Sequence, residues 1–91
     1  MYITNEGKRT STSNLRLLEG KGMEVLVSYQ TPVAYSIEGL WHYTSHKYSS
    51  TTSKQITRFL NARIGGRANA SEVSQQEVNA VAHLWRVKYG Q

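Results

Sequence analysis

Apolar and polar positions alternate through the first half of the chain, the pattern of β-strands that bury one face. Four such runs follow one another, at residues 14–18, 23–29, 33–37 and 40–43. Short turn-forming segments separate them, and Glu38-Gly39 has the length of a two-residue hairpin loop. The pattern predicts an antiparallel meander of three or four strands.

The segment Gln30-Thr31-Pro32 lies between the second and third runs. Proline has no backbone N–H to donate, so we expect the hydrogen-bonded ladder to be broken here. In the second run, Leu26 departs from an alternation that places Met23, Val25, Val27 and Tyr29 on one face. In the fourth run, Trp41 and Tyr43 share a face.

The hydrophobic period changes after this meander. Ile56, Phe59, Leu60 and Ile64 recur at the spacing of one helical face, so we expect a helix over residues 52–64. Gly65-Gly66 is typical of a helix end, because glycine readily takes the left-handed cap conformation. Residues 67–70 are expected to form a linker.

A second helix is predicted to start near Ser71 to Ser74 and to run to about Tyr89. Two capping boxes compete for its start, Asn69 with Glu72 and Ser74 with Glu77, and the second is the better match. Apolar residues cover well over half of this helix. Either the helix packs between the sheet and the first helix, or a surface with Ala80, Leu84 and Val87 forms a homodimer contact.

These elements predict the α+β class, a meander followed by two helices. At 91 residues the chain is expected to form a single domain over 14–91, preceded by a flexible segment at 1–13. There is no cysteine, so neither a disulfide nor a cysteine-type zinc site is expected. No apolar run is long enough for a membrane span or resembles a signal peptide, so we expect neither feature.

Charge is distributed unevenly along the chain. The net charge is +5, and no acidic residue lies between Gly39 and Ser71. That interval contains five cationic residues and two histidines, and such a concentration attracts phosphate-rich or acidic partners. The cationic residues are Lys47, Lys54, Arg58, Arg63 and Arg67.

The hydroxyl-rich stretch from Lys47 to Lys54 lies where the first helix should begin. Its hydroxyls suit capping of the helix by Ser50 or Thr51. The same N-terminal N–H groups could instead hold a phosphate beside the two lysines. The stretch contains no glycine, which argues against a phosphate-binding loop of the nucleotide-binding type.

We therefore consider the basic segment 42–67 as a surface for nucleic acid or another anion. Cations would neutralise phosphates and an exposed aromatic could stack on a base. The alternative is a solvated helix face beside core aromatics. No motif of a named nucleic-acid-binding module is present. The candidate residues are Lys47, Tyr48, Thr51, Thr52, Ser53, Lys54, Arg58, Arg63 and Arg67.

The sequence offers little for metal binding or catalysis. His42 and His46 would share a face on a helix, but on a strand they lie roughly 13 Å apart. Ser45 and His46 form a pair of the kind that occurs by chance, and no oriented base accompanies them. We expect no cofactor, no bound metal and no enzymatic activity.

Two segments resemble a family of small uncharacterised bacteriophage proteins. They are Ser28-Tyr29-Gln30-Thr31-Pro32-Val33-Ala34 and, further along, Lys47-Tyr48-Ser49-Ser50-Thr51-Thr52-Ser53-Lys54-Gln55. The resemblance covers residues 14–62. It implies an αβ fold, a phage or prophage origin and action in a bacterial cytoplasm. Residues from Ser71 onward lie outside it, as a possible partner-binding element peculiar to this chain.

The resulting functional hypothesis is a non-catalytic binding protein that contacts nucleic acid or another polyanion through residues 42–67. The alternative is an inhibitor of a host defence complex, of the anti-CRISPR type, that acts through protein–protein contact. A self-associating component of virion assembly is a third possibility. The expected partners are thus nucleic acid or a host protein complex, with a possible homodimer and no membrane.

Overall fold

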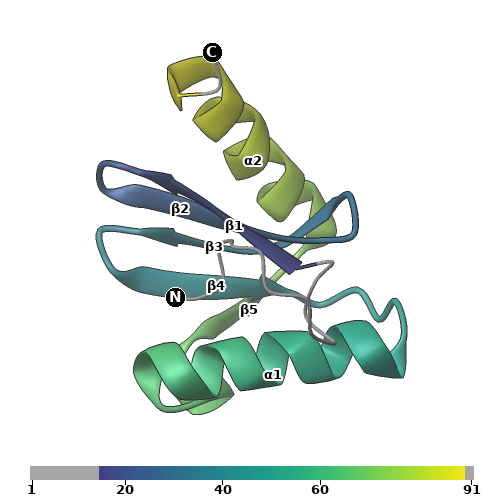
Figure 1. Ribbon diagram of the computed structural model, residues 1–91. Coiled ribbons are helices and arrows are strands. Elements are labelled where there is room, and N and C mark those ends of the chain that lie inside the picture. Colours follow the sequence, from purple (N-terminus) through teal and green to yellow (C-terminus); the bar gives the residue numbers. More distant parts are fainter. Residues whose placement is uncertain (1–14, 90–91) are drawn as a thin grey trace.

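A computed structural model describes residues 15–89 of the chain (Figure 1). The flexible segment predicted for residues 1–13 lies outside this range. The elements in chain order are β1 (Leu15–Gly20), β2 (Met23–Ser28), β3 (Thr31–Ile37), β4 (Leu40–Thr44), α1 (Ser50–Ile64), the 3-10 turn η1 (Arg67–Asn69), β5 (Ser71–Val73) and α2 (Gln75–Tyr89). Within this range, neither α-helix is long and apolar enough to cross a membrane.

The strands form one mixed sheet in the order β1-β2-β3-β4-β5. The first four are antiparallel neighbours, which confirms the predicted meander and the α+β class. The fifth strand pairs in parallel with β4, from His42 opposite Ser71 to Thr44 opposite Val73. The sequence predicted the start of the second helix near Ser71 to Ser74, and for residues 71–73 that prediction is wrong.

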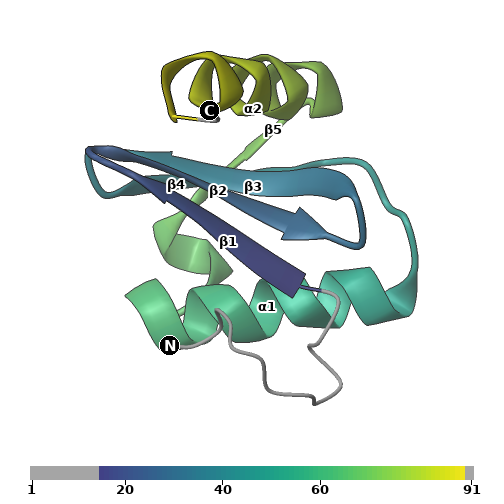
Figure 2. The same ribbon diagram turned by 45° about the horizontal axis from the view of Figure 1, so that its top comes forward.

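The two α-helices cover opposite faces of the sheet (Figure 2). On the α1 side, buried residues of the sheet pack against Ile56, Phe59 and Leu60. On the α2 side, a second cluster joins Val25, Val27 and Tyr35 to Val78 and Val81. The prediction that the second helix packs between the sheet and the first helix is therefore wrong.

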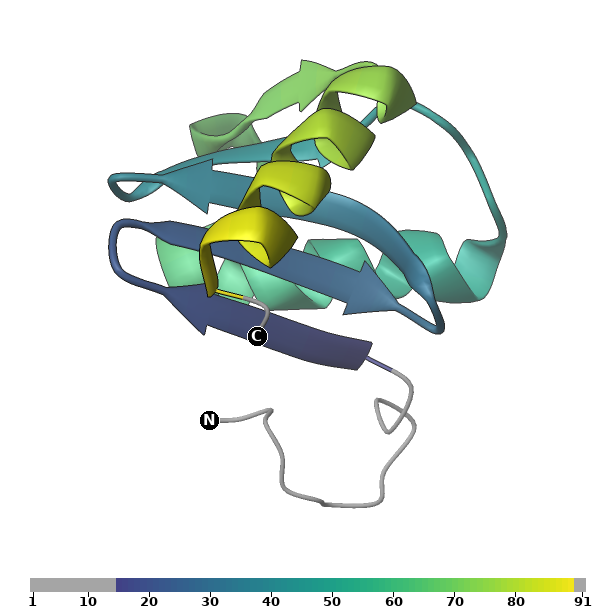
Figure 3. The same cartoon turned by 90° about the horizontal axis from the view of Figure 1, so that it is seen from above.

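Because both faces of the sheet are covered, the central strands bury side chains on both sides. Leu26 belongs to the cluster on the α1 side, whereas Val25 and Val27 belong to the cluster on the α2 side. This explains why Leu26 departs from the simple alternation. Figure 3 shows α2 crossing the strands obliquely, from the side of β5 toward the tip of the β1–β2 hairpin.

Pro32 lies inside β3, contrary to the expected break. It is the partner of Val27, while Ala34 is the partner of Leu26, so β3 carries one extra residue at this register shift. The extra residue is Val33, so the bulge interrupts the regular ladder directly beside Pro32, where a missing N–H donor is tolerated. The extra residue also brings both Val33 and Ala34 into the cluster on the α1 side.

The β3–β4 connection is the predicted two-residue hairpin. Glu38 and Gly39 have φ angles of 52° and 83°, the left-handed values that a type I′ turn needs at both central positions. The β2–β3 connection is equally tight and contains Tyr29, a non-glycine residue with a φ of 60°. The chain thus turns sharply at both ends of β3.

The N-cap of helix α1 lies one residue before Ser50 and two before Thr51, the two predicted caps. Ser49 is the N-cap, and its Oγ accepts a hydrogen bond of 3.1 Å from the backbone N–H of Thr52. Capping by Ser50 or Thr51 is therefore wrong, because both lie within the helix. At the other end Gly65 takes the left-handed conformation, at φ 87°, as predicted.

Helix α2 starts as the preferred capping box predicts. Ser74 Oγ accepts a hydrogen bond of 3.1 Å from the backbone N–H of Glu77. The Glu77 carboxylate does not complete the box, because it accepts a hydrogen bond from the Tyr35 hydroxyl. This contact fixes the start of α2 to the middle of the sheet.

Candidate nucleic-acid interface

The loop of residues 45–49 connects the end of β4 to α1 and carries the first candidate residues. Its start is fixed by two hydrogen bonds, from Ser45 N to the Val73 carbonyl (2.7 Å) and from His46 N to Thr44 Oγ1 (3.0 Å). The ring of His46 then contacts that of Tyr48 in a tilted arrangement, with the centroids 4.2 Å apart and an angle of 56° between the planes. The loop therefore presents Lys47 and Tyr48 from a hydrogen-bonded base.

A set of hydroxyl and amide groups joins α1 to the end of β2. Ser28 Oγ donates a 2.6 Å hydrogen bond to Gln55 Oε1 and lies 3.5 Å from Thr52 Oγ1. Thr52 Oγ1 also accepts from Ser49 Oγ at 3.3 Å. Ser28, Thr52 and Gln55 are all buried. Thr52, proposed above as an anion contact, is thus largely buried and holds the helix start in place.

The exposed face of α1 carries Thr51, Lys54 and Arg58 at successive turns. Their spacing of three and four residues places them on one stripe of the helix. Within residues 15–89, the side chains of Lys54 and Arg58 form no ion pair and no hydrogen bond, and the same holds for Lys47. These three cations remain available to an anionic partner.

Arg63 is engaged differently. Its Nη2 atom lies 2.9 Å from Glu24 Oε2, the one ion pair among the described residues. Its guanidinium also lies over the rings of Phe59 and Trp41, at 5.4 and 6.0 Å from their centroids. The sequence has no acidic residue between Gly39 and Ser71, but in the folded chain β2 brings the carboxylate of Glu24 beside Arg63.

Arg67 is also fixed by the protein. Its Nε donates to Thr57 Oγ1 at 2.9 Å, and its Nη2 donates to the carbonyl and the hydroxyl of Ser53 at 3.1 and 3.3 Å. The guanidinium lies 4.8 Å from the centroid of the Tyr43 ring. These contacts orient the positive charge of Arg67 along the flank of α1 and use the hydroxyl of Ser53.

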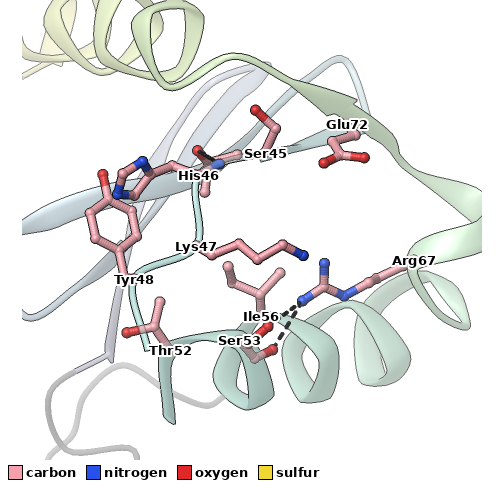
Figure 4. A pocket seen from close by; sticks show the side chains of 10 residues that line it. Ser45, His46, Lys47, Tyr48, Thr52, Ser53, Ile56, Arg67 and Glu72 are labelled. Carbon is pink, nitrogen blue, oxygen red and sulfur yellow. Dashed lines mark hydrogen bonds between the residues drawn. The ribbon is translucent and has the colours of Figure 1, made fainter. Parts of the chain in front are cut away.

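A small pocket of about 30 Å³ lies between this loop and the flank of α1 (Figure 4). Lys47 and Arg67 point toward one another across it. Glu72 of β5 lies on the opposite side of the pocket and adds a carboxylate to the lining. The volume suits a water molecule or a single small ion, and Glu72 reduces the positive potential there.

A larger groove of about 270 Å³ lies on the other side of Tyr48. It runs between the β2–β3 turn and the start of α1, and its lining combines two tyrosines with hydroxyl groups. Tyr48 and Thr52 line both this groove and the small pocket. The groove is lined by Ser28, Tyr29, Thr31, Val33, Tyr48, Ser49, Thr51 and Thr52.

The two histidines lie in different surroundings. His42 stacks on Tyr35, with ring centroids 4.7 Å apart, on the α2 side of the sheet. His46 makes a tilted ring contact with Tyr48 in the loop that leads to α1. Among residues 15–89, no group of three histidines and acids lies close enough to hold a metal ion.

Tyr35 carries the one resolved pKa shift in the described region. Burial raises the pKa of its hydroxyl to about 12, and the hydrogen bond to the Glu77 carboxylate and the charge of that carboxylate act in the same direction. The pair lies beneath α2, away from the basic loop. We assign it to the docking of α2 on the sheet.

The predicted self-association surface lies on the outer side of α2. Leu84 is 51% exposed and Val87 is 63% exposed, and Ala80 precedes them on the same stripe. The inner side of the helix is occupied by Val78 and Val81. The structure thus separates the candidate residues into two surfaces, on helices that cover opposite faces of the sheet.

One protein family has a sequence model that matches residues 2–80. The chain belongs to DUF8033, a family of unknown function. The DUF8033 match includes all five strands, α1 and the beginning of α2. Comparison with curated proteins and with solved structures gave no significant match.

The DUF8033 match covers more of the chain than the resemblance to bacteriophage proteins does. It extends on both sides of residues 14–62, over which the chain resembles bacteriophage proteins. Residues 71–80 belong to the matched region, so β5 and the start of α2 are not peculiar to this chain. The description of DUF8033 names no function and no source, so the bacteriophage origin stays a prediction.

Sequence reasoning missed Tyr29 and Thr31 as candidate site residues. Both were assigned to a strand end and a turn, remote in sequence from the basic segment. The tight β2–β3 turn brings them to the start of α1, where they line the groove with Tyr48. Their proximity depends on the docking of α1, which no local sequence pattern encodes.

Proposed function

We propose that this protein is a non-catalytic module that binds nucleic acid through the exposed side of α1 and the loop before it. The observation that carries the proposal is that three cations of this surface, Lys47, Lys54 and Arg58, form no ion pair within the described residues. Phosphates neutralised by lysine and arginine release counterions, which gives sequence-independent binding. Such binding requires no named recognition module.

Arg63 and Arg67 have supporting roles in this proposal. Arg67 is held along the flank of α1 by Ser53 and Thr57 and adds a fixed positive charge. Arg63 is neutralised by Glu24, so we assign it little of the binding. This division sharpens the sequence hypothesis, in which all five cations were equivalent.

Two features support a non-catalytic role. Ser49 and Ser74, whose hydroxyls could in principle act as nucleophiles, serve as helix caps. The ring of His46 contacts that of Tyr48, and within residues 15–89 no carboxylate orients it as a base. Nucleophilic catalysis needs an oriented base beside the nucleophile.

The proposal is tested by fluorescence anisotropy with labelled oligonucleotides at low ionic strength. The double variant Lys54→Ala/Arg58→Ala should weaken binding, because it removes two of the three unpaired cations. Arg86→Ala is the matched control, since Arg86 is an exposed helical arginine on α2. Equal affinities for all three proteins, or no binding by the wild-type chain, would overturn the proposal.

The outer side of α2 supports a second candidate function, inhibition of a host defence complex through protein contact. Leu84 and Val87 form an exposed apolar stripe that the fold itself does not use. This candidate function assumes that the protein originates from a bacteriophage and acts in the bacterial cytoplasm. A pull-down from nuclease-treated host lysate separates the two functions, because a single protein partner would favour the inhibitor and loss of all partners would favour nucleic acid.

A further inference from the structure

The groove beside Tyr48 has features that phosphate neutralisation does not require. Its volume is about 270 Å³, and two tyrosine side chains line it from different elements, Tyr29 from the β2–β3 turn and Tyr48 from the loop before α1. Both rings are substantially exposed, at 52% for Tyr29 and 42% for Tyr48. Charge neutralisation alone would need no aromatic surface there.

Tyr29 occupies a backbone conformation that disfavours its side chain. Its φ is 60°, a left-handed value at which glycine, asparagine or aspartate is usual in a two-residue hairpin. For a bulky residue this conformation is strained, and strain of this kind occurs at functional sites. With half of its surface exposed, the ring gains little burial to offset that cost. A tyrosine at this position therefore points to a role for the ring outside the fold.

Contacts within the protein hold part of the lining of the groove. The ring of Tyr48 contacts that of His46, and the side chains of Ser28 and Thr52 are buried. Gln55 lies behind Ser28, and its Nε2 atom is buried without a hydrogen-bond partner in the described chain. The groove is therefore preformed, with hydroxyl groups and two aromatic rings available to a ligand.

We propose that this groove takes an unpaired nucleobase of single-stranded nucleic acid, stacked on Tyr29 and Tyr48. The inference rests on the function proposed above and names its ligand class. Lys47 precedes Tyr48 in the chain, and Thr51 of the groove lies one turn before Lys54, so cations adjoin the groove on both elements. They meet the phosphates on either side of the bound base.

A duplex does not satisfy this arrangement. Its bases are stacked on both faces within the helix and cannot enter a groove between two side chains. Aromatic side chains that stack on bases are typical of proteins that bind single strands, and they tolerate any base because each has a π-face. The groove therefore favours single strands over duplexes, without sequence specificity.

The test compares oligothymidine, oligouridine and a duplex of equal length by fluorescence anisotropy. Tyr29→Asn removes the ring but suits the left-handed turn, so thermal stability should be equal to or higher than that of the wild-type chain. We expect single-strand affinity to fall roughly 5- to 150-fold in this variant, with duplex affinity unchanged. Tyr29→Trp is the conservative control and should retain single-strand binding.

The outcomes separate this inference from the proposed function. Unchanged single-strand affinity in a stably folded Tyr29→Asn variant, or equal wild-type affinity for single strands and duplex, would overturn the groove assignment while leaving polyanion binding intact. Absence of binding to every oligonucleotide would overturn both. Binding of oligouridine alone would support the groove and identify RNA as its ligand. Binding of oligothymidine alone would support the groove and identify DNA.

Discussion

The engagement of individual side chains decides which basic residues remain available for a partner. Arg63 and Arg67 contact protein groups, whereas Lys47, Lys54 and Arg58 have no such partner within residues 15–89. The five cationic side chains of this segment thus fall into two classes, those held by protein groups and those without a partner in that range. This distinction gives the first prediction at the scale of the residue.

Arg63→Ala should reduce oligonucleotide affinity less than Arg58→Ala does. Both variants remove one positive charge from α1, but Arg63 is already neutralised by Glu24. Conversely, Glu24→Gln should increase affinity, because it leaves the charge of Arg63 uncompensated. Anisotropy titrations at one low salt concentration measure all three. A larger loss for Arg63→Ala than for Arg58→Ala would contradict the assignment.

Tyr35 gives a second prediction at this scale, concerning pH. Its pKa in the folded protein is about 12, above the ordinary value of 10.0, because of burial and the contact with Glu77. The folded state therefore retains this proton to higher pH than the unfolded state does. The resulting stabilisation is complete below pH 10.0 and is lost as the pH rises toward about 12.

Tyr35→Phe removes this titration. Urea denaturation at several pH values should show a decline in the free energy of unfolding above pH 10.0 that is steeper in the wild-type chain than in the variant. The contribution of Tyr35 to that decline is at most about 3 kcal/mol, the equivalent of two pKa units. Parallel profiles for the two proteins would show that the Tyr35 hydroxyl does not contribute.

At the scale of the element, the start of α1 joins the fold to the candidate interface. Ser49 caps the helix, and the buried hydroxyls of Ser28 and Thr52 attach that end to β2. The exposed stripe of α1 begins at Thr51, two residues after this cap. Correct presentation of Lys54 therefore depends on the cap that Ser49 provides.

Ser49→Ala should lower the free energy of unfolding by about 1 kcal/mol, because a backbone N–H of α1 loses its partner. For a domain of this size, that change lowers the Tm by about 4–8 °C. Ser50→Ala is the matched control, since Ser50 is an exposed residue inside the helix, and its effect should be close to zero. Differential scanning calorimetry measures both. A larger effect of Ser50→Ala would indicate that the cap lies at the sequence-predicted position.

The elements also show what the sequence could and could not predict. The strands, the Glu38-Gly39 turn and the end of α1 at Gly65 follow from local patterns of period, turn type and glycine conformation. Strand β5 was missed because three residues carry no measurable alternation, and its parallel pairing depends on β4. The expected break at Pro32 was wrong because a bulge in β3 accommodates the proline. A bulge depends on the pairing of two strands, so the sequence of one strand does not reveal it.

At the scale of the whole molecule, the sheet separates two surfaces. Helix α1 presents the basic stripe on one side, and α2 presents Leu84 and Val87 on the other. The broad apolar character of α2 had two explanations in the sequence. Packing between the sheet and α1 is wrong, since α2 lies alone on its face, and self-association through Ala80, Leu84 and Val87 stays a prediction.

The candidate site could be predicted only in part. The sequence indicated the basic segment and the hydroxyl-rich helix start, because both are continuous along the chain. It could not show that Glu24 pairs with Arg63, that Glu72 and Lys47 line one pocket, or that Tyr29 and Tyr48 line one groove. Each of these depends on segments that are remote in sequence and meet through the sheet.

The most direct test of the central claim is the salt dependence of single-strand binding. Three neutralised phosphates predict a slope of about −2 for the logarithm of the association constant against that of salt concentration. In Lys54→Ala/Arg58→Ala, one remaining contact predicts a slope of about −0.7. Binding that does not depend on salt, or equal slopes for the two proteins, would contradict a polyanion interface on α1.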